Sequence, residues 1–162
     1  MACNSNVDTI EEYCGGPNAP QLKRALFITT LAKVSSIPAA VEHLVSGDIE
    51  MVATMLFYKW NFSKEESSFE SVQDENGMWN TTVKIFIEKM EAAKSNVLNG
   101  MNGDNYLAVP ADNNGSQRLV GELDNGCTVR VKEQTNPKNG YEVTITWQSA
   151  HSPYFYTGDI TT

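Results

Sequence analysis

The sequence of 162 residues has few histidines, few cysteines and no long apolar segment. No apolar run approaches the roughly 18 residues of a membrane-spanning helix, so we expect a chain that does not enter a membrane. The N-terminal stretch MACNSNVDTI has neither a basic start nor an apolar core, which predicts no secretory signal. We therefore expect a soluble protein that is synthesised in the cytoplasm.

The three cysteines, Cys3, Cys14 and Cys127, are odd in number and lack the C-x-x-C spacing. This pattern predicts neither a disulfide framework nor a zinc site, and we expect reduced thiols. Cys127 alternates with Val129 and Val131 along an expected strand. A small buried hydrophobe is therefore a better interpretation of Cys127 than a nucleophile.

Histidine is equally scarce, because His43 and His151 are the only two in the chain. Neither lies in a motif, and the signatures of the serine hydrolase elbow, the zincins and the nucleotide-binding loops are all missing. We expect surface or capping histidines. The sequence predicts no enzyme, no catalytic residue, no cofactor and no metal ligand, although catalytic residues that meet only in space stay an open alternative.

One stretch comes close to a calcium-binding loop. Asp112, Asn114 and Ser116 stand at alternate positions, as in an EF-hand. However, Gln117 occupies the sixth position, where that loop needs glycine, and Leu123 occupies the twelfth, where it needs a bidentate glutamate. A hairpin turn built on Asn-Asn-Gly explains the composition better.

The net charge of −8 argues against a protein that grips nucleic acid, because phosphate binding depends on clustered lysine and arginine. The three Asn-X-Ser/Thr sequons carry no weight in a chain without a signal peptide.

The hydrophobic pattern predicts a mainly β protein of the α+β class, an antiparallel β-sandwich or barrel with one packed helix. We expect a flexible N-terminal arm over residues 1–21, one β-rich assembly domain over 22–158 and a C-terminal tail over 159–162. The arm contains CGGPNAP, which suits neither a continuous helix nor a central strand.

The first half of the domain is expected to contain two long strands. KRALFITTLAKV predicts a strand buried on both faces, with Leu26, Ile28 and Val34 on one side. Residues 35–47 form either a short helix starting at Pro38 or a loop. Residues 49–62 alternate through Leu56, Tyr58, Trp60 and Phe62, which predicts a second strand.

Hairpins and one helix follow. Asn76-Gly77 predicts a tight turn before a strand that carries Trp79, Thr81, Val83, Ile85 and Ile87 on one face. EKMEAAKSNVLNGM predicts a helix with Met90, Ala93, Val97 and Leu98 on its packed stripe, ending at Asn99-Gly100. A hairpin from NYLAVPAD to QRLVGEL comes next. SPYFYTGDITT adds an edge strand or a tail, because Pro153 disfavours a central position.

The hairpin from Gly126 to Ser149 has two unlike faces. Cys127, Val129, Val131, Val143 and Ile145 are expected to face the core. The opposite face is too polar for a core, and we expect it to face water or another subunit; its residues are Thr128, Arg130, Lys132, Glu142, Thr144 and Thr146.

VKIFIEKMEAAKSNVLNG as strand and helix, followed by the hairpins NYLAVPADNNGSQRLVGEL and GCTVRVKEQTNPKNGYEVTITWQS, resembles the tail tube proteins of tailed bacteriophages. The likeness is architectural and spans about Arg24 to Gly158. The stretch NGYEVTITWQSAHSPYFYTG is also similar in character to small structural proteins of phages that infect Bacteroidetes.

The resemblance implies a virion protein without catalysis, made in the bacterial host. Its subunits would form a ring, commonly a hexamer, in which each gives strands to one inner barrel. Stacked rings would form a channel for the genome and contact other tail or connector proteins. An acidic lumen would let DNA slide without sticking. We expect replacement of Thr144 and Thr146 by proline to block the ring.

Three other readings stay open at this point. Within viruses, the chain could be a capsid decoration or head-to-tail connector protein, and a contractile injection system tube would share the geometry. In a different class, a small-ligand or carbohydrate-binding β-barrel could use Tyr58, Trp60 and Trp147 to line a cavity. The tryptophans Trp60, Trp79 and Trp147 are otherwise expected in the core or in a subunit interface.

Overall fold

The computed structural model describes residue 10 and residues 18–23, 25–101, 103, 105–160 and 162. It is mostly β structure with one α-helix, which confirms the predicted fold class. The strands are β1 (Ala25–Thr30), β2 (Val34–Ser36), β3 (Leu44–Val45), β4 (Glu50–Met51), β5 (Tyr58–Asn61), β6 (Ser68–Gln73), β7 (Trp79–Glu88), β8 (Tyr106–Val109), β9 (Gln117–Leu119), β10 (Thr128–Gln134), β11 (Gly140–Ser149) and β12 (Tyr154–Tyr156). The helices are the 3₁₀ turns η1 (Leu31–Lys33) and η2 (Lys64–Glu66) and the α-helix α1 (Ala92–Asn99).

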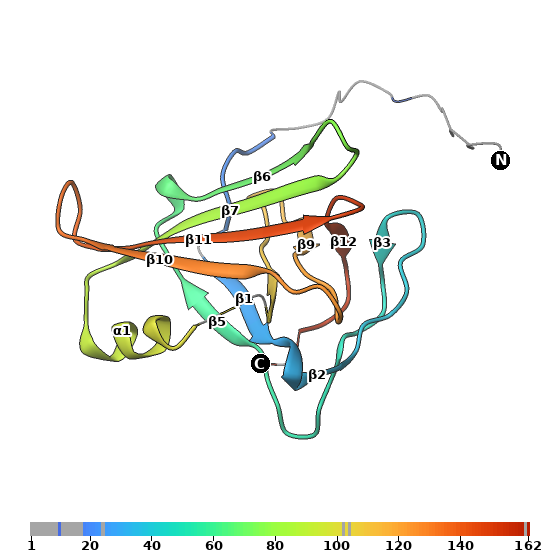
Figure 1. The fold of residues 1–162 in the computed structure, drawn as a ribbon, viewed down its shortest axis with the longest axis horizontal. Helices are drawn as coiled ribbons and strands as arrows, with labels where there is room; N and C mark the ends of the chain where they lie inside the picture. Colours follow the sequence, from blue (N-terminus) through green and yellow to red (C-terminus); the bar gives the residue numbers. More distant parts are fainter. Residues whose placement is uncertain (1–9, 11–17, 24, 102, 104, 161) are drawn as a thin grey trace.

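Four sheets organise these strands (Figure 1). The largest has the order β10-β11-β7-β6 and is antiparallel throughout. A second antiparallel sheet has the order β5-β1-β8, and a third has the order β3-β12-β9. Strands β2 and β4 form a two-stranded sheet.

Two hydrophobic cores lie on opposite faces of the β5-β1-β8 sheet. Leu26 and Ile28 of β1 pack into the first core, together with Val83, Val143 and other inward-facing residues of the large sheet. Phe27, between them in sequence, packs against the second core. β1 is therefore buried on both faces, as its alternation predicts.

The hairpin turn between β6 and β7 forms where Asn76-Gly77 predicts it. Gly77 adopts φ +83°, a conformation that other residues rarely tolerate. The side chain of Asp74 closes the turn, because its Oδ1 accepts hydrogen bonds from the backbone N–H groups of Asn76 and Met78 at 2.8 and 3.0 Å. This turn fixes the register of the two strands.

The predicted long strand over residues 49–62 is wrong in its middle. Only β4 and β5 are extended there, and residues 52–57 form a loop in which Met55 N–H donates to Val52 O. Thr54 has φ +67° at the tip of this loop, which no strand accommodates. Residues 35–47 contain no helix; the loop alternative is correct for residues 37–43, whereas residues 35–36 end β2 and Leu44–Val45 form β3.

The prediction that Val34 lies on the same side of the first strand as Leu26 and Ile28 is also wrong. The 3₁₀ turn η1 interrupts the alternation after Thr30, and Val34 packs in the second core, whereas Leu26 and Ile28 pack in the first.

The helix is shorter and less buried than predicted. Strand β7 continues to Glu88, and α1 begins only at Ala92. Leu98 is its only buried residue, while Val97 is 55% exposed. Of the expected stripe, Leu98 and Met90 pack at the first core, whereas Val97 remains exposed.

The C-terminal strand has a different place from the predicted edge. Strand β12 is central in its sheet, parallel to β3 and antiparallel to β9. Pro153 immediately precedes β12, so the missing N–H removes no hydrogen bond from the strand itself.

Of the predicted N-terminal arm, residues 1–9 and 11–17 lie outside the described residues. Its last residues contact the folded domain: Ala19 N–H donates to Asn114 Oδ1, and Gln21 Nε2 donates to Glu65 O.

Candidate functional site

The hairpin formed by β10 and β11 has the two faces that its sequence predicts. Val129, Val143 and Ile145 are at most 6% exposed and pack in the first core. Cys127 is fully buried before β10, and burial raises the pKa of its thiol to about 12. The predicted interpretation of Cys127 as a buried hydrophobe is confirmed, since a thiol with so high a pKa is a poor nucleophile at neutral pH.

The strand register extends the polar face of this hairpin across all four strands of the large sheet. We call this surface the polar sheet face. It consists of Ser68, Glu70 and Val72 on β6, Asn80, Thr82 and Lys84 on β7, Glu142, Thr144, Thr146 and Gln148 on β11, and Thr128, Arg130 and Lys132 on β10.

The strand register arranges these side chains in rows across the sheet. Thr146 lies opposite Thr128 on one side and Thr82 on the other. Thr144 lies between Arg130 and Lys84 in the next row. Lys84, Arg130 and Lys132 form no ion pair with another described residue. The face therefore carries cationic groups that are free to contact a partner.

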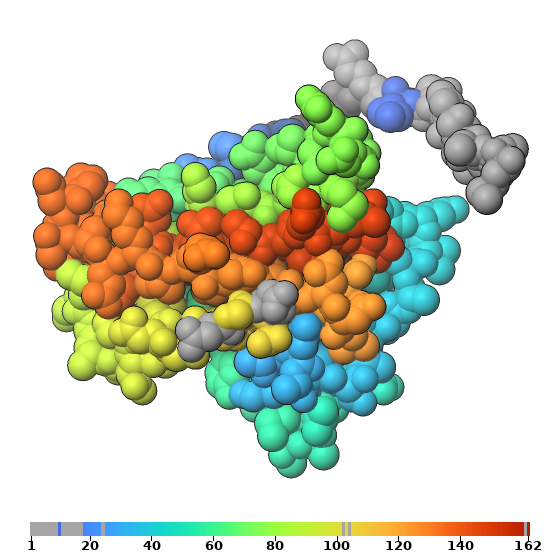
Figure 2. Space-filling model, in the orientation of Figure 1, coloured from blue at the N-terminus to red at the C-terminus, as the bar shows by residue number. Residues whose placement is uncertain are grey.

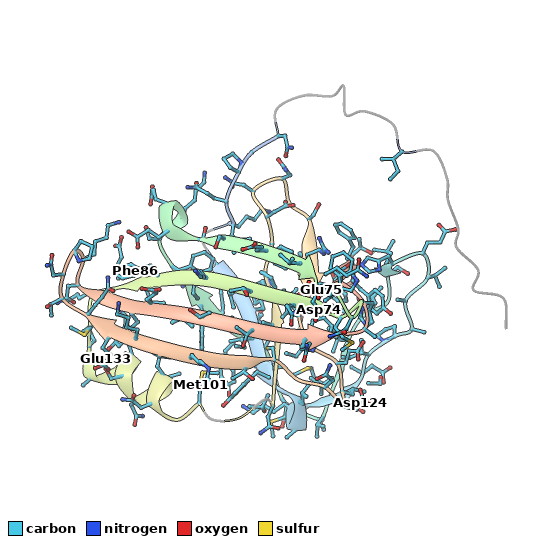
Figure 3. All side chains as sticks on the ribbon, turned by 45° about the horizontal axis from the view of Figure 1, so that its top comes forward. Asp74, Glu75, Phe86, Met101, Asp124 and Glu133 are labelled. Atoms are coloured by element: carbon cyan, nitrogen blue, oxygen red, sulfur yellow. The ribbon has the colours of Figure 1, made fainter. Side chains whose placement is uncertain are left out.

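The polar sheet face is not an acidic surface. Its three basic side chains are balanced by Glu70 and Glu142 and, at the end of β7, by Glu88. Asp74, Glu75 and Asp124 lie at one end of the sheet, opposite the end marked by Phe86 and Glu133 (Figure 3). The acidic lumen expected from the net charge is thus not a property of this face.

Among the residues that the structure describes, no strand pairs with the outer edge of β10 or of β6 in the large sheet. Lys89 N–H donates to Asn139 O, which sets the odd-numbered residues of β11 and β7 as the bonded pairs between those two strands. Even-numbered residues then bond β11 to β10 and β7 to β6, as the Asp74 N–H to Met78 O bond confirms. The backbone groups of Val131 and Glu133 on β10, and of Ser71 on β6, consequently point out of the sheet.

A second polar cluster gathers the two histidines, which sequence analysis treats as unrelated. The ring centroids of His43 and His151 are 6.4 Å apart. His151 stacks on Tyr154 at 4.0 Å, and Arg118 donates two hydrogen bonds to Pro153 O at 3.0 and 2.8 Å. The fold brings these residues together from separate parts of the chain, and no local sequence motif predicts the cluster.

Hydrogen bonds hold both imidazole rings of this cluster in place. His151 Nδ1 faces Ser152 O at 2.7 Å, and its Nε2 faces Glu122 Oε1. His43 Nε2 faces Pro153 O at 3.1 Å and Ser152 Oγ at 2.8 Å.

This geometry does not form a hydrolytic triad. His43 Nε2 can donate to Pro153 O in one tautomer or accept from the Ser152 hydroxyl in the other. In the described residues no carboxylate contacts the other nitrogen of His43, so the third member of a triad is missing. Burial lowers the pKa of His43, and the charges of Arg118 and His151 act in the same direction, whereas the contact with Pro153 O opposes the shift. The cluster ties the β11–β12 connection to β3 and β9.

The cavity expected from three aromatic residues does not form. Trp147 is buried in the first core and donates its Nε1–H to Asn125 O at 2.9 Å. Tyr58 is 54% exposed and accepts a hydrogen bond from Lys33 Nζ at 2.6 Å. Trp60 alone lines a groove, of about 750 Å³, between β5 and α1.

The predicted calcium-like loop is a turn between β8 and β9. Asp112 Oδ1 accepts the N–H groups of Asn114 and Ser116 at 2.9 and 3.0 Å, so this carboxylate caps its own turn. Within the described residues, no three side chains of the metal-binding types converge on one point.

No protein-family model, curated protein or solved structure matches this chain. In the part of the chain that the structure describes, no helix is long and apolar enough to cross a membrane. We take the polar sheet face, together with the edges of β10 and β6 that no described strand covers, as the candidate functional site.

Proposed function

We propose that this chain is a virion structural protein, the subunit of a bacteriophage tail tube, and that it acts without catalysis. Its large sheets join edge to edge into a closed ring, expected to be a hexamer, and stacked rings form a channel for the genome. The observation that carries this proposal is the four-stranded sheet with one polar face and two unpaired edges.

The strand count suits ring closure. Four antiparallel strands leave β10 and β6 running in opposite directions. Copies related by rotation about one axis therefore bring β10 of one subunit beside β6 of the next in antiparallel orientation, the more favourable pairing. An odd number of strands would give parallel contacts instead.

The faces match across such a contact. The residues whose backbone groups point outward, Val131 on β10 and Ser71 on β6, both direct their side chains to the core side of the sheet. Pairing these residues keeps every polar sheet face on one side of the ring. Closure also removes two sheet edges that would otherwise invite aggregation.

A channel with this lining would not repel DNA as an acidic wall would. Threonine rows and balanced charges give few fixed cations per subunit, and phosphate binding grows with the number of cations that it meets. We propose passage over a near-neutral polar wall, with the acidic groups concentrated elsewhere.

Proline at the outward-facing edge positions tests the proposal. Ser71→Pro and Glu133→Pro each remove one N–H that points out of the sheet, so the monomer stays folded while edge pairing is lost. We expect wild-type rings or tubes in negative-stain images and only monomers from either variant. Circular dichroism checks that the variants remain folded.

Ser71→Val and Glu133→Thr serve as matched controls, because both keep the edge N–H and suit a strand. The proposal fails if the proline variants assemble like wild type. Trimers bound to a shell would instead favour a decoration protein, and a monomer that binds sugars would favour a ligand-binding domain. Proline at Thr144 or Thr146 is a poorer test than the sequence suggests, because β11 is central and the monomer itself would unfold.

A further inference from the structure

A two-residue turn carries His43 to the side of β12. Val41 N–H donates to Leu44 O and Leu44 N–H donates to Val41 O, at 2.9 and 3.0 Å, so Glu42 and His43 form the tip of a tight hairpin. The turn leads into β3, which pairs with β12 over only two residues (Figure 1). Figure 2 shows the segment around β3 in light blue at the right of the view, at the surface of the molecule.

The tip of this turn is strained. Glu42 and His43 have φ values of 52° and 65°. Tight hairpin turns with two positive φ values normally use Asn-Gly, because this conformation brings the Cβ atom of other residues against the backbone. Such strain persists only where contacts elsewhere in the fold hold the residues in place. The contacts of the turn with the rest of the molecule therefore decide whether it keeps this shape.

The contacts that hold the turn come from one short segment. Phe155 N–H donates to His43 O at 3.0 Å, and the His43 ring lies edge-on to the ring of Tyr154, with the centroids 4.9 Å apart. His43 Nε2 lies 3.1 Å from Pro153 O and 2.8 Å from Ser152 Oγ. All four partners belong to β12 or to the two residues before it. The His43 residue therefore fastens the turn to the start of β12.

The charged groups around the His43 ring are cationic. Arg118 of β9 donates to the same oxygen, Pro153 O, through Nε and Nη2 at 3.0 and 2.8 Å. The ring of His151 lies 6.4 Å away, centroid to centroid, and the carboxylate of Glu122 contacts His151. In the described residues, no carboxylate forms a hydrogen bond or an ion pair with His43. A positive charge on His43 would share a carbonyl oxygen with Arg118 and have no anion in contact to balance it.

A second proton on the His43 ring has no favourable place in this arrangement. Where Nε2 accepts from the Ser152 hydroxyl, protonation of Nε2 removes that acceptor. Where Nε2 donates to Pro153 O, the added proton goes to Nδ1, which has no hydrogen-bond partner in the described residues. The closed turn therefore favours the neutral ring, in agreement with the lowered pKa of His43.

We propose that the turn over residues 41–44 is an acid-sensitive latch. In mild acid the His43 ring takes up a proton, the turn leaves β12 and relaxes its strained backbone, and the Phe155 N–H is left unpaired at the edge of that strand. Because the closed turn favours the neutral ring, neutral pH favours the closed state and acid favours the released state. The latch works within a single chain and does not depend on ring assembly.

The release is local. Val45, the second residue of β3, is 1% exposed in the second core and accepts the Thr157 N–H at 3.1 Å. Neither contact involves His43, so the chain stays attached to the domain beyond the turn. Small openings of this kind occur in a protein that is otherwise folded. Acid therefore gives the folded domain an unpaired piece of strand edge, a structure able to pair with another chain.

Hydrogen exchange read at single amides tests the latch. The amides of Leu44 and Phe155 in the wild-type protein should lose protection between about pH 7.5 and about pH 5.5, the range in which histidine titrates, after correction for the intrinsic exchange rate at each pH. Their exchange should not depend on low concentrations of urea, because the opening exposes little surface. Amides of β11 should exchange only through unfolding of the domain, with a full dependence on urea.

His43→Asn should abolish the additional exchange of these two amides in acid. Asparagine accepts a positive φ and can donate to Pro153 O, but it has no titrating ring. His151→Gln is the matched control, because it removes the other histidine and keeps His43. The loss of protection in this control should be smaller than in the wild type, since one neighbouring charge is gone, but it should persist.

Glu42→Asn separates the strain from the charge. This change relieves the backbone at one of the two strained residues and keeps the His43 ring. Protection of the Leu44 and Phe155 amides should rise at both pH values, while the loss between them remains.

The inference is overturned if the Leu44 and Phe155 amides keep their protection in acid, or if they exchange only together with β11. It is also overturned if His43→Asn loses as much protection in acid as the wild type, or if His151→Gln alone abolishes the loss. Circular dichroism checks that each variant is folded, and the urea series on the wild-type protein decides between local and global opening without any variant.

Discussion

Residue 43 shows how much depends on the surroundings of a single side chain. Glu42 and His43 both adopt positive φ values, 52° and 65°, which place His43 beside His151 and the Ser152–Pro153 backbone. Non-glycine residues rarely hold this conformation unless neighbouring contacts determine it. Here the determining contacts come from β12, whose Phe155 N–H donates to His43 O at 3.0 Å, and from the segment before it.

The lowered pKa of His43 predicts a loss of stability in mild acid. The folded protein holds fewer protons at this ring than the unfolded chain, whose ordinary pKa is 6.5. The stabilisation is therefore complete above about pH 6.5 and is lost as pH falls through the folded pKa. The free energy of unfolding in urea should be lower at about pH 5.5 than at about pH 7.5.

His43→Asn should reduce this dependence on pH, because asparagine has no titrating ring, tolerates positive φ and can still donate to Pro153 O. Urea titrations of both proteins at the two pH values measure the effect. An equal loss of stability in the two proteins would show that His43 is not the group responsible.

The histidine cluster could not be predicted from the sequence for a physical reason. Its members come from separate parts of the chain: His43 lies in the turn before β3, His151 in the link between β11 and β12, and Arg118 in β9. By contrast, Cys127 could be predicted, because alternation with Val129 and Val131 reports burial directly. Sequence patterns reveal which face a residue lies on and not which distant residue it meets.

At the scale of elements, helix α1 depends on one tyrosine of β11. The Tyr141 hydroxyl donates to Glu91 O at 3.0 Å, accepts from Glu91 N–H at 3.2 Å and shares a hydrogen bond with Ser95 Oγ at 2.5 Å. The helix has eight residues, too few to be stable alone. Tertiary contacts of this kind therefore hold it against the sheet.

Tyr141→Phe should lower the free energy of unfolding by about 1–2 kcal/mol, because it removes the hydroxyl that hydrogen-bonds to the Glu91 backbone and to Ser95 Oγ. Hydrogen exchange should speed up in residues 91–99 and stay unchanged in β7. Urea unfolding and exchange mass spectrometry measure the two effects. Uniform acceleration across the sheet would contradict this assignment.

The elements that could be predicted are those with a local cause. Asn76-Gly77 forms its turn because glycine accepts φ +83°, and β10 and β11 alternate because one face packs in the core. The strand predicted over residues 52–57 was wrong, because an apolar loop and a buried strand have similar composition. The exposure of Met55 and Leu56 could not be predicted from the sequence.

At the scale of the whole molecule, the decisive feature is the large sheet. The core covers one of its faces, and in the described residues no strand pairs with its two edges. The first core covers the inner face, while the polar sheet face and the edges β10 and β6 are left without a partner in the described residues. The sequence predicted the polar face from the Gly126–Ser149 hairpin. It could not predict that β7 and β6 extend that face, because strand order depends on long-range pairing.

A reconstruction of the purified wild-type assembly by electron cryomicroscopy tests the central claim most directly. We predict a closed ring in which β10 of each subunit is hydrogen-bonded to β6 of the next, antiparallel, with Thr144 and Thr146 facing the channel. A particle in which β10 and β6 lie unpaired, or in which the polar sheet face points outward, would contradict the account.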